Sequence, residues 1–279
     1  MRWFWITTGA VTFTLVLKLA FTGQVSLIPE EAYYWNYARH LDFGYFDHPP
    51  MVGWLIWLAT SLLGKSEWSI RLPAYLCWLI TAAFMFRLTV TLCDRPAAYR
   101  TVMLVAVLPI YFGLGFFMTP DAPLCAAWAG SLYFLERALI RQDRCAWTPM
   151  GVCLGIAMMS KYSAALLGVT TLIFLIIDRQ SHRWFQRREP YIAALIALAL
   201  FSPVVFWNLK NAWGSFWFQG PARWSGSHHF AFHVLIGTVL LLLTPTGLLA
   251  ITRVLVSDRR NCTALSNEIE TARRQHLWV

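Results

Sequence analysis

The chain has 279 residues, of which 58% are hydrophobic and only 13% are charged, and its mean hydropathy is +0.51. Such a composition excludes a soluble globular domain and predicts an integral membrane protein. The net charge of +9 would indicate a nucleic-acid partner for a soluble domain. In a membrane protein the basic residues instead collect at the cytoplasmic surface, so we expect no nucleic-acid partner.

Several apolar stretches approach the length of about 20 residues that crosses the hydrocarbon core of a bilayer. They cover residues 4–22, 73–92, 101–118, 122–140, 147–160, 162–178, 190–207 and 231–252. These stretches predict an all-α integral membrane protein of about eight transmembrane helices. We expect one polytopic domain over residues 1–252, whose first stretch is a retained span, and a polar cytoplasmic tail over residues 253–279.

The distribution of basic residues predicts how these helices are oriented. With the N-terminus in the cytoplasm, sixteen of the 23 lysines and arginines fall in cytoplasmic segments and seven fall outside. This excess on the cytoplasmic side supports the orientation. The loop 23–72 then faces the periplasm or exterior, together with the turns 118–123 and 160–162 and the aromatic loop 208–230.

The loop 23–72 contains the only long polar segment in the apolar first half of the chain. Within it, Glu30 and Glu31 follow Pro29, and Asp42 and Asp47 come later. Carboxylates do not lie unpaired in hydrocarbon, so this loop is the first place to look for chemistry. Because Pro29 suits the first turn of a helix, the two glutamates also have a purely structural interpretation, in which they match the helix dipole.

The apolar run 51–63 begins after Pro49 and Pro50. Its thirteen residues would reach only about 20 Å as a helix, which is too short to span the membrane. We therefore expect an interfacial helix that lies against the bilayer, with Trp54 and Trp57 at the depth that tryptophan favours.

Six short motifs together resemble the C-type glycosyltransferases of bacteria, which are related to protein O-mannosyltransferases and to the lipid A aminoarabinose and galacturonic acid transferases. The motifs are Glu-Glu-Ala-Tyr-Tyr-Trp (30–35), Gly-Tyr-Phe-Asp-His-Pro-Pro (44–50), Arg-Leu-Pro (71–73), Thr-Pro-Asp-Ala-Pro (119–123), Ser-Lys-Tyr (160–162) and Trp-Asn (207–208) followed by Trp-Gly-Ser-Phe (213–216). They occur in the order that the family has, on the face expected to be outside.

The resemblance implies transfer of a sugar from a polyprenyl or dolichyl phosphate carrier to a lipid A, glycolipid or protein acceptor at the periplasmic face of the bacterial inner membrane. It implies that Glu30 is the principal catalytic carboxylate, with Asp121 as its partner. The tyrosines near Glu30, namely Tyr33 and Tyr34, and the pair Asp47 and His48 would bind the donor phosphate. No cofactor or metal is implied.

The chemistry of the reaction supports the same residues. Displacing a phosphate from an anomeric carbon requires a base for the attacking hydroxyl and donors for the charge that builds on the leaving phosphate. Glu30 and Asp121 meet the first requirement. Charge-assisted hydrogen-bond donors meet the second, and His48, Lys161 and Tyr34 can supply them, with Arg39 as a further candidate. Together with the residues that the resemblance implies, our candidates for contacts to the sugar donor are Glu31, Tyr33, Tyr34, Asp47, His48, Lys161 and Tyr162.

Several of these residues have simpler interpretations. Asp121 can cap the helix that follows it, Lys161 can extend its charge to the membrane surface, and His48 can be an ordinary loop residue. His228 and His229 have no further ligand at metal spacing, so we expect no metal site there.

Three functions remain open on the sequence. The glycosyltransferase leads. Relatives usually carry Asp-Glu where this chain has Glu30-Glu31, and they continue with further spans, which leaves a catalytically impaired or truncated lipid-binding paralogue as the alternative. A transporter is the third, although no duplicated half or ionisable residue near mid-membrane favours it.

Overall fold

The computed structural model describes residues 2–222, 231–241, 244, 247–249 and 252–253. The described residues belong to two compact units, one within Met1–Val107 and Tyr111–Ser227 and the other within Leu108–Ile110 and His228–Val279. Across these described ranges the chain is helical and contains no strand, which confirms the all-α expectation. Residues 254–279 of the expected tail, His228, His229 and part of the stretch 231–252 lie outside the described residues.

The helices of the chain, in order, are α1 (Arg2–Thr22), α2 (Pro29–Arg39), α3 (Met51–Leu63), α4 (Glu67–Leu92), α5 (Arg95–Val107), α6 (Pro109–Leu114), α7 (Asp121–Leu139), α8 (Trp147–Ser160), α9 (Ala165–Ile177), α10 (Glu189–Lys210) and α11 (Gly214–Trp217). Short 3-10 turns occur at η1 (Arg144–Ala146), η2 (Tyr162–Ala164) and η3 (Arg179–Gln186), and a π-helical turn, η4, covers Phe218–Ala222. An apolar helix, Phe232–Leu241, belongs to the second unit.

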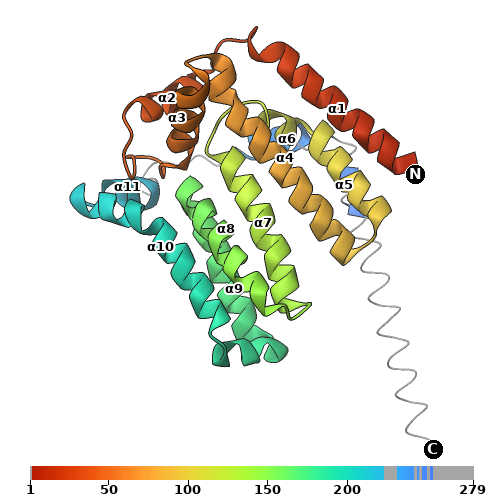
Figure 1. Ribbon diagram of the computed structural model, residues 1–279, viewed down its shortest axis with the longest axis vertical. Coiled ribbons are helices and arrows are strands. Elements are labelled where there is room, and N and C mark those ends of the chain that lie inside the picture. Colours follow the sequence, from red (N-terminus) through yellow and green to blue (C-terminus); the bar gives the residue numbers. More distant parts are fainter. Residues whose placement is uncertain (1, 223–230, 242–243, 245–246, 250–251, 254–279) are drawn as a thin grey trace, which may run out of the picture. The chain divides into compact units, whose positions relative to one another are not determined.

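The long helices of the first unit pack side by side in the spatial order α1, α5, α4, α7, α8 and α10 (Figure 1). α2 and α3 pack on each other at one end of this row, next to the start of α4. We call this end of the first unit the loop end. Because the chain alternates in direction, the loop end also receives the last residues of α8 and α10 and the first residues of α7.

Three described helices, α1, α4 and α10, are long and apolar enough to cross a membrane. A fourth candidate is the pair Tyr162–Ile177 and Arg179–Gln186, which bends by 109°. The other expected spans are helical but shorter, with 14 residues in α8 and 13 in α9. The chain therefore has the character of an integral membrane protein, while the count of eight spans stays a prediction.

The helix expected over residues 101–118 is divided between α5 and α6, and Pro109 explains the break. Proline has no N–H to donate and its ring clashes with the carbonyl four residues earlier. That carbonyl, on Val105, instead accepts a hydrogen bond of 3.0 Å from Nε1 of Trp78 on α4. The carbonyl that the proline leaves without its helical partner is therefore satisfied, and the same bond attaches α5 to α4.

The short helix expected over residues 51–63 forms with those bounds, as α3. Val52, Ile56 and Ala59 face the protein at helical spacing. Trp57 and Leu62 point away and are 44% and 74% exposed. One buried face and one exposed apolar face are what a helix lying against a bilayer requires.

Helices α8 and α10 approach most closely at Gly151, where a Cβ atom would lie 2.7 Å from Cα of Ala193. The backbone cannot yield easily, so we expect Gly151→Ala to lower stability by about 1–3 kcal/mol. Gly9→Ala in α1 is the matched control, because its Cβ would meet nothing within 4 Å. Thermal unfolding of the purified variants in detergent checks this, and an equal effect of both substitutions would contradict it.

Candidate active site at the loop end

A fully buried ion pair joins α2 to α4. The side chains of Glu31 and Arg71 are both 0% exposed, and Nη2 of Arg71 lies 2.7 Å from Oε2 of Glu31. Nε of Arg71 donates to Oε1 of Glu31 at 3.0 Å. The carboxylate also accepts the backbone N–H groups of Ile28, at 3.2 Å, and of Met118, at 3.1 Å. Glu31 is therefore saturated by protein donors.

The remaining donors of Arg71 bind the segment that follows α1. Nη1 donates to the carbonyls of Thr22, at 2.7 Å, and Val25, at 2.8 Å, and Nη2 donates to the carbonyl of Ser26 at 3.0 Å. These contacts satisfy carbonyls at the end of a helix, which otherwise lack partners. The guanidinium of Arg71 thus fixes the end of α1 and the start of α2, and the carboxylate of Glu31 adds the turn before α7.

Asp47 is held by phenols from α2. Tyr33 donates to its Oδ1 at 3.1 Å, and Tyr37 donates to the same oxygen. Nδ1 of His48 lies 3.0 Å from the other oxygen, Oδ2. Burial alone would raise the pKa of Asp47, but His48 and the two tyrosines outweigh it and lower that pKa below its ordinary value of 3.8. Asp47 is therefore an ionised anchor for the loop before α3.

Tyr34 lies among the candidate residues. Its side chain is 7% exposed, and its ring meets that of His48 edge to face at 5.6 Å between centroids. Burial raises the pKa of Tyr34, and the negative charges of Asp47, Asp121 and Glu30 raise it further. The phenol therefore stays protonated and can donate a hydrogen bond to an oxyanion.

Asp121 and Lys161 form a half-exposed ion pair, with 2.8 Å between Oδ1 and Nζ. Asp121 is the first residue of α7, and Lys161 is the extended residue that ends α8. The next residue, Tyr162, exchanges a hydrogen bond of 2.6 Å with Oγ of Ser215. The interruption between α8 and α9 thus directs two adjacent polar side chains toward the loop end.

The end of α10 and the described residues that follow it also contact this site. Nε1 of Trp207 donates to Oδ2 of Asp42 at 2.8 Å, and its ring is so near Gly44 that a Cβ there would lie 3.0 Å away. Asn208 is fully buried, and its side-chain oxygen accepts the N–H of Phe216 at 3.3 Å. Trp207 therefore attaches the end of α10 to the segment between α2 and α3, and Asn208 attaches it to α11.

An apolar cavity of about 320 Å³ adjoins these groups. Met158, Phe201 and Phe216 form much of its wall, and Tyr162 and Gln219 line it as well. Gln219 donates its side-chain N–H to the backbone carbonyl of Asp47. The apolar cavity therefore begins at Tyr162, the residue next to Lys161 of the polar cluster.

Comparison with known proteins identifies the family. Residues 47–207, more than half of the chain, match the pattern of the dolichyl-phosphate-mannose-protein mannosyltransferases. The chain belongs to this family. The family resemblance expected from the six motifs is confirmed.

Within this family, the chain is similar to two curated proteins and to one solved structure. It is 25% identical to the lipopolysaccharide core galacturonosyltransferase RgtA of Rhizobium johnstonii, over 72% of this chain and 41% of the relative. It is 22% identical to the undecaprenyl phosphate-alpha-4-amino-4-deoxy-L-arabinose arabinosyl transferase of Photorhabdus laumondii, over 70% of this chain and 37% of the relative. The chain thus spans about two fifths of these proteins.

The fold is similar to that of ArnT from Cupriavidus metallidurans bound to undecaprenyl phosphate. The TM-score is 0.71 at 19% identity, and the match covers 87% of this chain and 50% of that one. The arrangement of helices described above is therefore shared with a solved member of this group.

The structure brings most of the predicted residues together, but it places the side chains of Glu30 and Glu31 in different surroundings. Glu30 is exposed, whereas Glu31 is buried and occupied by Arg71. The others gather around Tyr34 and the adjoining cavity, namely Tyr33, Asp47, His48, Asp121, Lys161 and Tyr162.

Several residues at this site were not singled out by the sequence. Tyr37 has the plainest signal, because it lies four residues after Tyr33 and so shares its helix face. Arg71 stood within a motif but carried no assigned role. Asp42 was noted only as a carboxylate of the loop 23–72, Ser215 only as a member of the last motif, and Gln219 had no signal. The partners that give them a place here are more than 50 residues away.

Glu31→Gln keeps the shape of the side chain but leaves the guanidinium of Arg71 buried without a counter-charge. Losing one partner of a buried pair costs about 3–5 kcal/mol, so we expect a large fall in the unfolding midpoint measured in detergent. Glu30→Gln is the matched control and should leave the midpoint near that of the wild type, because Glu30 is exposed. Similar losses in both variants would refute the structural role of Glu31.

The lowered pKa of Asp47 predicts a dependence of stability on pH. A carboxyl group with a lower pKa in the folded state stabilises the fold above its unfolded pKa and loses this effect as the pH falls through the folded value. We expect the wild type to lose stability below about pH 4 more steeply than Asp47→Asn, with Tyr37→Phe between them. Unfolding midpoints at stepped pH measure this, and parallel profiles would count against it.

Proposed function

We propose that this chain carries the donor site of a membrane glycosyltransferase, which moves a sugar from a polyprenyl phosphate carrier to an acceptor on the periplasmic face of a bacterial inner membrane. The observation that carries the proposal is the grouping of Glu30, Asp121 and His48 around Tyr34, beside Lys161 and an apolar cavity. Carboxylates, phosphate donors and space for a lipid chain are the parts that this reaction needs.

The reaction forms one bond and breaks another at the anomeric carbon of the sugar. An acceptor oxygen attacks that carbon, the bond from the carbon to the phosphate oxygen breaks, and the phosphate leaves with the electron pair. We assign Glu30 as the base that takes the proton of the attacking hydroxyl, since it is the exposed glutamate. Asp121 would orient the acceptor, with its own direction set by Lys161.

The leaving phosphate gains negative charge, and three groups of this site suit it. Lys161 would supply positive charge, and His48 and the neutral phenol of Tyr34 would donate hydrogen bonds. Asp47 holds His48 in place at 3.0 Å. Glu31, whose oxygens are taken by Arg71 and backbone N–H groups, would act by positioning α2 rather than by touching the donor.

The acceptor is best sought among lipids. The two relatives are named as a lipopolysaccharide core galacturonosyltransferase and an arabinosyl transferase, which favours lipid A or a related glycolipid over protein. The sugar is either of the hexose type, as the name of the first relative indicates, or of the pentose type, as the name of the second indicates. The cavity of about 320 Å³ beside Tyr162 is where the first isoprene units of a carrier would lie.

Glu30→Gln tests the assignment of the base. Removing a general base lowers the rate by about a hundredfold to ten-thousandfold, so we expect turnover to fall within that range while donor binding persists. The assay incubates the purified protein with a panel of polyprenyl phosphate sugars and a membrane-lipid extract, and mass spectrometry follows loss of donor and gain of sugar on the acceptor.

Glu67→Gln, which removes a carboxylate from the start of α4, is the control and should keep full activity. Activity that survives in Glu30→Gln would overturn the assignment of the base. Donor binding without turnover in the wild type would instead identify a lipid-binding paralogue.

A further inference from the structure

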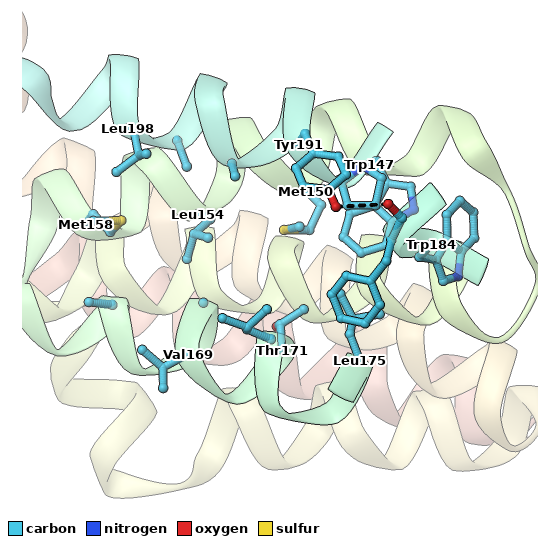
Figure 2. A pocket seen from close by; sticks show the side chains of 17 residues that line it. Trp147, Met150, Leu154, Met158, Val169, Thr171, Leu175, Trp184, Tyr191 and Leu198 are labelled. Carbon is cyan, nitrogen blue, oxygen red and sulfur yellow. Dashed lines mark hydrogen bonds between the residues drawn. The ribbon is translucent and has the colours of Figure 1, made fainter. Parts of the chain in front are cut away.

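A second cavity lies between α8, α9, α10 and η3, and it extends away from the loop end (Figure 2). Its volume is about 380 Å³. Along α8 its lining extends from Trp147 to Met158, which at 1.5 Å per residue is about 16 Å. This length is close to half of the hydrocarbon thickness of about 30 Å, so the cavity is as long as one leaflet. We call it the Trp147 cavity.

The lining of the Trp147 cavity is apolar along most of its length, and its polar groups gather at one end. Trp147, Trp184 and Tyr191 lie together there, whereas Met158 and Leu198 lie at the other end (Figure 2). The two tryptophans are 1% and 3% exposed, and neither indole N–H meets an acceptor among the residues that the structure describes. A buried donor without an acceptor is costly, which indicates a missing partner.

Arginines flank the same end. An adjoining cavity of about 410 Å³ shares Phe185 and Tyr191 with the Trp147 cavity and is lined by Arg187 and Arg188. In the described part of the chain no carboxylate lies within ion-pair distance of either arginine. The apolar Trp147 cavity thus has, beside its polar end, two arginines without an ion pair among the described residues.

We propose that this pair of cavities binds one anionic phospholipid. Its acyl chain would fill the Trp147 cavity, its phosphate would meet Arg187 and Arg188, and its ester oxygens would accept the indole N–H groups of Trp147 and Trp184. Basic pockets between membrane helices are suited to acidic headgroups, and indole groups are favoured at the depth of the ester region. The site is separate from the donor site, which lies at the opposite ends of α8 and α10.

A polyprenyl chain is the competing occupant, because the Trp147 cavity shares Met158 and Ala165 with the cavity beside Tyr162. The polar groups at the Trp147 end of the cavity argue against a polyprenyl chain as the occupant. A carrier with its phosphate at Lys161 would place only hydrocarbon near Trp147 and Trp184, and it would leave both indoles and both arginines without partners. A phospholipid that enters from the arginine end satisfies all four.

Native mass spectrometry of the full chain tests this proposal. The protein is purified in detergent, exposed to equal amounts of phosphatidylglycerol, phosphatidylcholine and a polyprenyl phosphate, and scored for retained lipid. We expect one phosphatidylglycerol to be retained in preference. The double variant Arg187→Gln and Arg188→Gln should reduce its retention by about tenfold or more. The matched control is Arg95→Gln with Arg100→Gln, at the start of α5, which should retain lipid like the wild type.

Gly168→Leu tests the acyl chain separately. Gly168 lines the Trp147 cavity, and a Cβ there meets only Leu154, at an ordinary 3.5 Å, so the larger side chain fills the cavity without displacing the backbone. We expect it to abolish retention of phosphatidylglycerol, whereas Gly9→Leu in α1, which faces open space, should not.

Equal retention of the two phospholipids by the wild type would overturn the proposal, as would retention unchanged in both cavity variants with unfolding midpoints like the wild type. Retention of polyprenyl phosphate rather than phospholipid, lost in Gly168→Leu, would assign the cavity to the carrier and also refute it.

Discussion

The loop end depends on one buried contact, the ion pair between Glu31 and Arg71. Two charges without solvent are stable only when each is fully hydrogen-bonded, and here the carboxylate takes donors from Arg71, Ile28 and Met118. Arg71 in turn binds carbonyls after α1. Because these partners come from four separate segments, the pair sets the position of α2, and with it the position of every side chain that α2 presents.

A second tier of contacts builds on that position. Tyr33 and Tyr37, one turn apart on α2, hold Asp47, and Asp47 holds His48. The same helix carries Tyr34, whose buried phenol lies where the charges of Asp121 and Glu30 reach it. Two neighbouring residues of one short helix therefore differ in role. The buried Glu31 positions the helix, whereas the exposed Glu30 is the one that we propose as the base.

The two ends of the helix row have opposite chemical characters. At the loop end, carboxylates are paired with a lysine and a histidine, and Trp207 of α10 donates to a further carboxylate, that of Asp42. At the other end of α8 and α10, arginines without carboxylate partners in the described residues adjoin a cavity of one leaflet's length. The phosphate of the proposed donor and that of the proposed phospholipid would therefore lie at opposite ends of α8 and α10.

Helical architecture, the short α3 and the break at Lys161 were all readable from the sequence, because apolar runs, prolines and an isolated lysine are local signals. The motifs likewise indicated the family and which loops carry the polar residues. The resemblance singled out Glu30 as the catalytic carboxylate, but the local pattern did not show which of Glu30 and Glu31 would be buried, since adjacent residues share it. Only tertiary structure decided that one is buried against Arg71 and the other exposed, because that choice depends on a partner 40 residues away. The division of residues 101–118 at Pro109 lies between these cases. The proline was visible, but the indole of Trp78 that accommodates the break comes from another helix.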